Sequence, residues 1–480
     1  MNDAVRLIAL NAAFAVVGLV VLRFAGIPGG RGWRGTLAGL SPAVGLATCG
    51  LAAAVCAMTG LGVGLLATGI VVVLVLAAAG LVLRGRRPGL ASLGPRLHRG
   101  VVVRVIELAL LVLLGVLSVG VLRLYAATGL TQWDGWAMWA PKAHALYVEH
   151  DVWGPVFRDP AYLMQHQEYP VLLPSLQALS ADAVDRFDRA LIDIETGAVL
   201  VSFGWGAWAI LRLVVAPWLS AGVALALTGS VPLIDNGSGN YADTALAAFT
   251  ALGFLCAFVW LSRGAPALLV LSALFFAAAA STKAEGLLYA LAAIAAVLAV
   301  ARGFGRSLRS VAWFSVAVLA VPAMWAVVDR LNGPGAKNVD RAALTNPSAM
   351  VDASGRIPES ARRLLSESWN RWPVACVLVV LGLASACVAR RWWEAAFGGL
   401  WGGLSLAALI GVYYANAAPI DWLLETSADR VVFSGVLGLA VSAPLLVGAA
   451  WETVVAHSDD RTRASPPIRP DGSAASRIAP

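Results

Sequence analysis

The sequence predicts an all-α integral membrane protein, a polytopic bundle of about thirteen transmembrane helices. Of the 480 residues, 59% are apolar and only 13% are charged, and the mean hydropathy is +0.77. This composition excludes a water-soluble enzyme of this length and an intrinsically disordered chain. Apolar runs of about 20 residues, the length that crosses a bilayer as a helix, recur along the whole sequence.

These apolar runs define the predicted membrane helices in order. They are residues 5–24, 37–58, 61–83, 103–125, 190–211, 214–234, 242–262, 266–281, 285–301, 308–328, 373–389, 395–414 and 431–452. The first run has no convincing small-residue cleavage site and leads into a polytopic body, so it is predicted to be a retained helix and not a signal peptide.

The runs also divide the chain into six predicted regions. These are N-terminal transmembrane helices (1–125), an external catalytic loop with interfacial helices (126–190), a transmembrane core (191–328), a second external loop (329–372), C-terminal transmembrane helices (373–453) and a disordered cytoplasmic tail (454–480).

The distribution of charge predicts which loops share a side of the membrane, because short cytoplasmic loops collect Lys and Arg. If the arginine-rich loop at 84–104 is cytoplasmic, alternation gives the inside 19 basic and 5 acidic residues, and the outside 13 basic and 21 acidic. The net charge of +7 is therefore largely a positive-inside signature and not a nucleic-acid footprint. The loop at 329–371, with seven Lys or Arg, fits this assignment least well.

The polar residues between the helices cluster on the predicted external side. The first loop begins with Trp133, Asp134, Trp136, Trp139 and Lys142, and the helical period places the three tryptophans on one stripe. Such a stripe is typical of an interfacial helix with aromatic anchors, although a proline at 141 would kink it. Anchoring of the loop to the bilayer, without any catalytic role, also explains these tryptophans.

Four further polar clusters follow on the same predicted side. They are His166 with Glu168, Tyr169 and Pro170; the Gly- and Asn-rich turn 235–243, ending at Asp243; Lys283 with Glu285; and 421–430, ending at Arg430. Interpretations without a functional role also exist. Lys283 and Glu285 fit a solvated connector, and Asp243 suits the start of a helix. The coincidence of several independent clusters on one side favours a functional site.

These residues resemble a known pattern, that of the GT-C superfamily of membrane glycosyltransferases, near its protein mannosyltransferase and aminoarabinose transferase branch. The matching pieces are Trp133-Asp134 with Trp139 and Lys142, His166 with Glu168-Tyr169-Pro170, Tyr241-Ala242-Asp243, Thr282-Lys283-Ala284-Glu285-Gly286, and Ser427 with Asp429-Arg430. Together they cover residues 132 to 430 in the order that such enzymes show. No single piece is specific, and the ordered set carries the resemblance.

The resemblance implies a GT-C-like fold and an enzyme that moves a sugar from a polyprenyl-phosphate carrier to a glycan, lipid or protein acceptor on the extracytoplasmic face. It implies that Asp134 is the catalytic acid/base. We expect Asp134 to act as a general base, which gives inversion. The resemblance also implies that Lys283 and Arg430, with Lys142, bind the carrier phosphate. The other residues expected to bind the substrate are His166, Glu168, Tyr169, Asp243, Glu285, Trp133 and Trp139.

Two departures from the family pattern bear on these expectations. The external aspartate follows about the fourth predicted helix instead of the first, which three additional N-terminal helices explain. Gly135 stands beside it where the family often has a second acid. A divalent metal is therefore an open expectation, with Glu168 or Asp243 as substitute ligands.

The prediction from the sequence is a multi-pass plasma-membrane glycosyltransferase of cell-envelope glycan synthesis, with its active site on the extracytoplasmic side. A polytopic transporter or flippase for a lipid-linked or anionic substrate is the alternative, and it would place charges near the bilayer midplane. A non-catalytic scaffold is a third possibility. The enzyme interpretation requires Asp134, Lys283 and Arg430 to converge at one surface.

Overall fold

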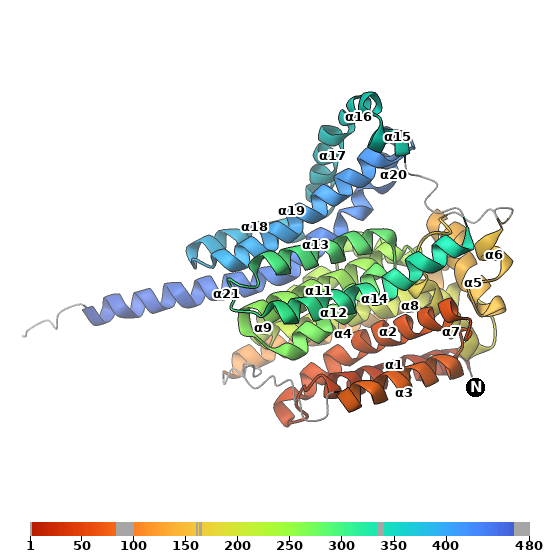
Figure 1. Cartoon of the computed structure of the whole chain (residues 1–480). Coiled ribbons are helices and arrows are strands. Elements are labelled where there is room, and N and C mark those ends of the chain that lie inside the picture. The colour runs from red at the N-terminus through yellow and green to blue at the C-terminus, as the bar shows by residue number, and fades with distance from the viewer. Residues whose placement is uncertain (1, 83–99, 160–161, 163–165, 334–339, 465–480) are drawn as a thin grey trace, which may run out of the picture.

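The computed structural model describes residues 2–82, 100–159, 162, 166–333 and 340–464, and over these ranges it is helical and contains no β-strand. Most of the helices lie side by side along one axis, which runs horizontally in Figure 1. Helices α5 and α6 cap one end of this bundle, and α18 ends and α19 begins at the other. We call these the α5 end and the α19 end.

The first third of the chain forms long helices and the helices of the first large loop. Their bounds are α1 Asp3–Phe24, η1 Arg31–Trp33, α2 Arg34–Thr59, α3 Leu65–Val82, α4 Val101–Thr128, η2 Gly135–Trp139, α5 Ala140–Glu149, α6 Pro155–Arg158 and α7 Leu172–Val184. Common helix-capping residues mark some of the helix ends. Asn2 caps α1, and Gly60 ends α2 in a left-handed conformation.

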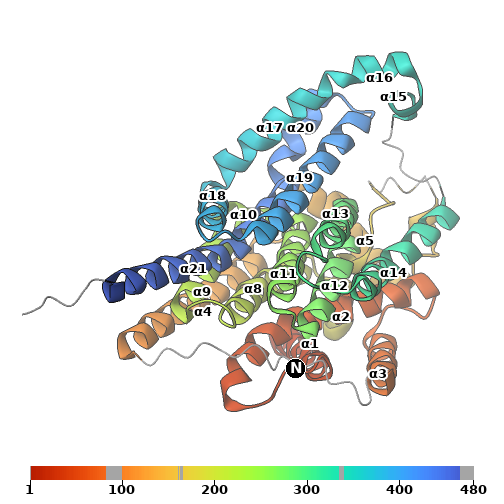
Figure 2. The same cartoon turned by 60° about the vertical axis from the view of Figure 1, so that its left-hand side comes forward.

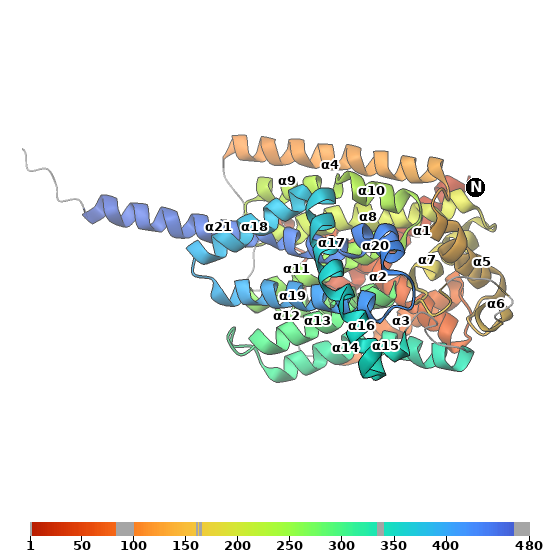
Figure 3. The same cartoon turned by 90° about the horizontal axis from the view of Figure 1, so that it is seen from above.

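The middle third forms the centre of the bundle. Its helices are α8 Arg189–Leu211, α9 Pro217–Thr228, α10 Val231–Ser238, α11 Ala242–Arg263, α12 Pro266–Ala280, α13 Ala284–Val300 and α14 Leu308–Asn332. The most hydropathic 18-residue segment of α11 is entirely buried, and α11 packs against α8, α12 and α21. In Figure 3, α4 and α14 lie on opposite sides of this centre.

The last third consists of α15 Arg341–Thr345, α16 Pro347–Ser354, α17 Arg356–Arg371, α18 Pro373–Val388, α19 Trp392–Ala415, α20 Ile420–Val431 and α21 Phe433–Ala464. In Figure 2, α15, α16, α17 and α20 lie at the top, beside the bundle, whereas α21 packs against α11. The chain turns by 103° between α17 and α18, at Pro373, which cannot continue the preceding helix.

Eight helical segments of the described chain are long and apolar enough to cross a membrane, or up to ten if two bent pairs each count as one span. The bent pairs are α9 with α10, at 49°, and the α16–α17 segment with α18. Three shorter apolar helices lie at Leu65–Ala78, Pro266–Ala280 and Ala284–Val300. The chain is therefore an all-α membrane protein, as the sequence predicts, and each of the thirteen predicted ranges overlaps one of these apolar helices or bent pairs.

Two of the predicted regions and one predicted turn contain more helix than expected. The external loop 329–372 contains α15, α16 and α17. Residues 454–464, expected to belong to a disordered tail, are part of α21. Residues 235–238 of the expected turn belong to α10, so only residues 239–241 join α10 to α11. The arginines of 84–99 that anchor the orientation prediction lie outside the described residues, as does 465–480.

Candidate functional site

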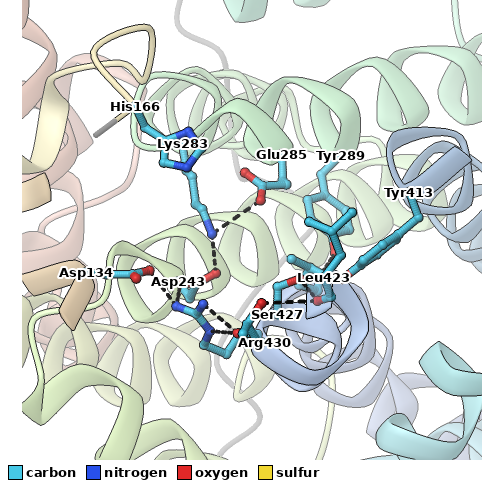
Figure 4. A network of polar contacts seen from close by, with 12 residues as sticks. Asp134, His166, Asp243, Lys283, Glu285, Tyr289, Tyr413, Leu423, Ser427 and Arg430 are labelled. Atoms are coloured by element: carbon cyan, nitrogen blue, oxygen red, sulfur yellow. Dashed lines mark hydrogen bonds and ion pairs between the residues drawn. The ribbon is translucent and has the colours of Figure 1, made fainter. Parts of the chain in front are cut away.

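Five charged residues form one chain of ion pairs at the ends of four different segments (Figure 4). Arg430 Nη1 lies 2.6 Å from Asp134 Oδ2 and 3.7 Å from Asp243 Oδ2. Lys283 Nζ lies 2.8 Å from Asp243 Oδ1 and 3.3 Å from Glu285 Oε1. Asp243 thus connects the two cations, and three acids and two cations that are far apart in the sequence share one site.

Helix ends explain why these charges lie where they do. Asp243 and Glu285 stand in the first turns of α11 and α13, where a helix dipole favours a carboxylate. Arg430 stands in the last turn of α20, where the dipole favours a cation. Lys283 is the residue before α13, in an extended conformation that directs its side chain toward α11. Local helix electrostatics and the ion pairs therefore reinforce one another.

The ion-pair chain is largely shielded from solvent. Asp243 and Lys283 are 1% and 5% exposed, and Asp134 and Glu285 are also buried. Arg430 closes the outer side, with its guanidinium carbon 4.3 Å from the centre of the Tyr241 ring. Because a buried charge without a partner is strongly unfavourable, each member of the chain depends on the others.

Asp134 is positioned by an unusual local backbone. It directly precedes η2, a five-residue π-helical turn, and α5 then begins with Pro141 in its first turn. At Gly135 the backbone lies so close to the α10–α11 connection that a Cβ atom would be 2.3 Å from the carbonyl oxygen of Gly239. Only glycine permits this approach. The residue beside Asp134 is therefore explained by packing, and a second acid would not fit there.

Replacing Gly135 with Ala is expected to destabilise the protein by about 1–3 kcal/mol, because the backbone of η2 must move away from Gly239. Gly120→Ala in α4 is the matched control, since nothing lies within 4 Å of a Cβ atom there. The melting temperature in detergent checks both. A Gly135→Ala protein as stable as the Gly120→Ala protein would contradict the close approach.

A second cluster lies next to the ion-pair chain and is built around Lys142. Its ammonium group is completely buried and donates hydrogen bonds to the backbone carbonyls of His166 and, at 3.0 Å, Tyr169. His166 Nδ1 lies 2.9 Å from Glu168 Oε1, and the rings of Trp139 and His166 both stack on Tyr169. Lys142 therefore holds the segment before α7 in place through its main chain.

Tyr169 joins the two clusters. The Lys142 ammonium lies 5.7 Å from the centre of its ring, and the Lys283 ammonium lies 6.0 Å from the same centre. One aromatic ring thus contacts both lysines, at a distance that gives a favourable cation–π interaction. Replacing either lysine is therefore expected to change the environment of the other through this ring.

Burial changes the titration of the second cluster. It lowers the pKa of Lys142 to about 7, against the opposing effect of the Glu168 and Asp329 carboxylates. Burial alone would raise the pKa of Glu168, but the hydrogen bond and charge of His166 bring it below its ordinary value. In this arrangement the hydrogen bonds of Lys142 hold the loop, and its phosphate-binding role stays a prediction.

The structure separates the predicted site residues into three groups. Asp134, Asp243, Lys283, Glu285 and Arg430 form the ion-pair chain. Lys142, His166, Glu168, Tyr169 and Trp139 form the second cluster. Trp133 belongs to neither: it is 47% exposed and packs edge to face on Trp136, with ring centres 6.0 Å apart.

The expected stripe of three tryptophans is wrong. Trp133 and Trp136 are exposed, whereas Trp139 is fully buried. The physical reason is η2, because a π-helical turn has a different number of residues per turn and rotates Trp139 away from the other two. Trp139 therefore packs inside the loop and does not anchor it at the surface.

Sequence reasoning missed two tyrosines beside the ion-pair chain. Tyr413 and Ser427 share a hydrogen bond of 2.7 Å, and Tyr289 donates a hydrogen bond to the backbone carbonyl of Val431. Tyr289 follows Glu285 by four residues in α13, so the two lie on one helix face (Figure 4). The spacing of four residues between Glu285, a predicted site residue, and Tyr289 was the sequence signal that could have identified Tyr289. These hydrogen bonds fix the end of α20 that carries Arg430.

An apolar cavity of about 400 Å³ adjoins the site. Tyr289 and Val432 line the part nearest to Arg430, and the rest is lined by apolar residues and glycines of α18, α19 and α21, with Leu365 and Trp369 of α17 at one side. The cavity is partly open. Tyr289 connects the two, because it lines this cavity and also donates a hydrogen bond to Val431, the residue after Arg430. The cavity is lined mainly by apolar groups, which suits a hydrocarbon chain.

No group of three or more His, Cys, Asp or Glu side chains suited to hold a metal ion occurs among the residues that the structure describes. The carboxylates of the site pair with Lys283 and Arg430. Comparisons of this chain with protein-family models, curated proteins and solved structures find no match.

Proposed function

We propose that the protein is a membrane glycosyltransferase that takes a sugar from a polyprenyl-phosphate carrier. The observation that supports this most is the combination of a buried acid, Asp134, two cations, Lys283 and Arg430, and an adjoining apolar cavity. A lipid-linked sugar has three parts to match: a reacting carbon that needs an acid/base, a phosphate that needs cations, and a long hydrocarbon tail.

In the proposed reaction, the acceptor hydroxyl oxygen attacks the anomeric carbon of the sugar. The bond between that carbon and the phosphate oxygen breaks, and its electron pair leaves with the polyprenyl phosphate. The hydroxyl proton passes to Asp134, which acts as general base. Lys283 and Arg430 stabilise the departing phosphate. A single displacement of this kind inverts the configuration of the sugar.

The ion pair between Arg430 and Asp134 gives this reaction an order. At 2.6 Å from the guanidinium, the Asp134 carboxylate is paired with Arg430. An incoming phosphate competes with it for Arg430, and a released Asp134 is then free to accept a proton. Uptake of that proton also offsets the negative charge that the phosphate brings into the site. Donor binding therefore precedes activation of the acceptor.

The topology belongs to the same proposal. We propose that the three shorter apolar helices cross the membrane as well as the eight long apolar helices and the two bent pairs, so that the chain has thirteen spans in a GT-C-like arrangement. The α5 end is then the extracytoplasmic side of the plasma membrane, because loops that the charge alternation assigns to the outside meet there. The partners are the bilayer, the lipid-linked donor and a glycan, lipid or protein acceptor of the cell envelope.

The direct test incubates the purified protein with a panel of polyprenyl-phosphate sugars and a hydroxyl acceptor such as a membrane glycolipid, and measures released polyprenyl phosphate. Release that requires both protein and acceptor is the expected result. A transporter or flippase would move the intact lipid across a vesicle membrane without releasing phosphate. Such movement without cleavage, over the whole panel, would overturn the proposal.

A further inference from the structure

The α19 end of the bundle carries a polar pocket that takes no part in the proposed transfer. It lies between α11, α19 and α21, has a volume of about 70 Å³, and contains the side chains of Ser262, Arg263, Arg391 and Glu394. Arg391 Nη1 lies 3.5 Å from Glu394 Oε1, and Arg391 remains half exposed. Arg263 is exposed. Two guanidinium groups thus border one small pocket.

Helix ends and tryptophans place this pocket at a membrane surface. Arg263 lies in the last turn of α11, and Arg391 directly precedes α19. Trp392 and Trp393 follow Arg391 and are 61% and 51% exposed, although they begin an apolar helix. Exposed tryptophans at the end of such a helix are typical of the boundary between lipid headgroups and hydrocarbon.

The polar pocket continues into apolar space. It shares Phe258, Glu394 and Leu446 with a second cavity, which is otherwise lined mainly by apolar residues of α18, α19 and α21. That cavity lies deeper along α19, where Gly398 leaves room beside Leu439. From the surface inward, the protein thus offers cations, then one carboxylate, then a small apolar cavity.

We propose that this pocket binds a phospholipid of the adjacent leaflet, with its phosphate on Arg263 and Arg391. The apolar cavity below it, of about 20 Å³, is too small for an acyl chain, so both chains of the lipid stay in the bilayer. The two guanidinium groups exceed the single Glu394 carboxylate by one positive charge, which matches one phosphodiester. Basic pockets between membrane helices are suited to this chemistry. The site is separate from the ion-pair chain at the α5 end, so it stands whether or not the protein is a transferase.

The test is native mass spectrometry of the full-length protein titrated with phosphatidylglycerol, or with diacylglycerol of the same chains, which lacks the phosphate. We expect the protein to retain phosphatidylglycerol, and the double variant Arg263→Gln/Arg391→Gln to bind it about tenfold more weakly, which corresponds to about 1.4 kcal/mol. The single variant Arg263→Gln should lie between them. Arg263 and Arg391 are both exposed, and a melting temperature confirms that each variant is folded.

The matched control is Arg302→Gln/Arg309→Gln, which removes the same charge from exposed arginines of the α13–α14 connection and the start of α14. We expect it to bind phosphatidylglycerol like the unmodified protein. Equal losses in the two double variants would mean that only general charge attracts the lipid, and would overturn the proposal. Equal binding of diacylglycerol, or no retained lipid, would overturn it as well.

Discussion

Asp134→Asn is expected to reduce sugar transfer by about 10²- to 10⁴-fold, the usual contribution of a general base. Asparagine has nearly the same shape, and its amide oxygen can still accept the Arg430 hydrogen bond that Asp134 Oδ2 accepts at 2.6 Å. It cannot take a proton from the acceptor hydroxyl. The loss should therefore fall on the chemical step, measured as the single-turnover rate of polyprenyl phosphate release, with donor binding retained.

Asp421→Asn is the matched control for this variant. Asp421 is an exposed acid in the first turn of α20, the helix that carries Arg430, and replacing it removes the same charge. It should transfer sugar at the unmodified rate. An Asp134→Asn protein that keeps full activity would exclude Asp134 as the base, even if transfer itself is confirmed.

Lys283→Met is expected to have the largest effect on folding, a loss of about 3–5 kcal/mol, because it leaves buried carboxylates without their cation. Lys283 Nζ serves both Asp243, at 2.8 Å, and Glu285, at 3.3 Å. Methionine keeps the length of the side chain and removes only the charge and the hydrogen bonds. The melting temperature and the yield of monodisperse protein measure this effect. Arg330→Met, at an exposed position near the end of α14, should leave both unchanged.

A second substitution separates stability from function. Adding Asp243→Asn to Lys283→Met removes one of the stranded charges, so part of the lost stability should return. Donor binding should not return, since the phosphate still lacks Lys283. A Lys283→Met protein as stable as the unmodified one would show that the ion pair does not form. Recovery of donor binding in the double variant would exclude Lys283 as a phosphate-binding residue.

Composition and periodicity predicted the membrane class and the position of the apolar helices, because a spanning helix has a strong signal over about 20 residues. The enzyme interpretation required Asp134, Lys283 and Arg430 to converge. In the structure Arg430 pairs with Asp134, and Asp243 links Arg430 to Lys283. These residues could be predicted to meet because each lies in a connection at the same end of the bundle.

Other features depend on contacts that no local pattern encodes. The π-helical turn before α5 arises where Gly135 packs on the α10–α11 connection, over one hundred residues later in the chain, and its rotation of Trp139 could not be read from a regular helical period. Lys142 was expected to bind phosphate because it is a cation at the predicted surface. It proved to be buried beneath Tyr169, whose position between two lysines is a tertiary property.

The ion pair of Asp134 and Arg430 also has a consequence for biosynthesis. The two residues are separated by 296 positions, so at common rates of translation the acid exists for about 15–60 s before its partner is made. Asp243 is likewise synthesised 40 positions before its partner Lys283. In the nascent chain, Asp134 must therefore stay hydrated until α20, which carries Arg430, has been synthesised. A product that stops short of Arg430 lacks the cation that pairs with Asp134.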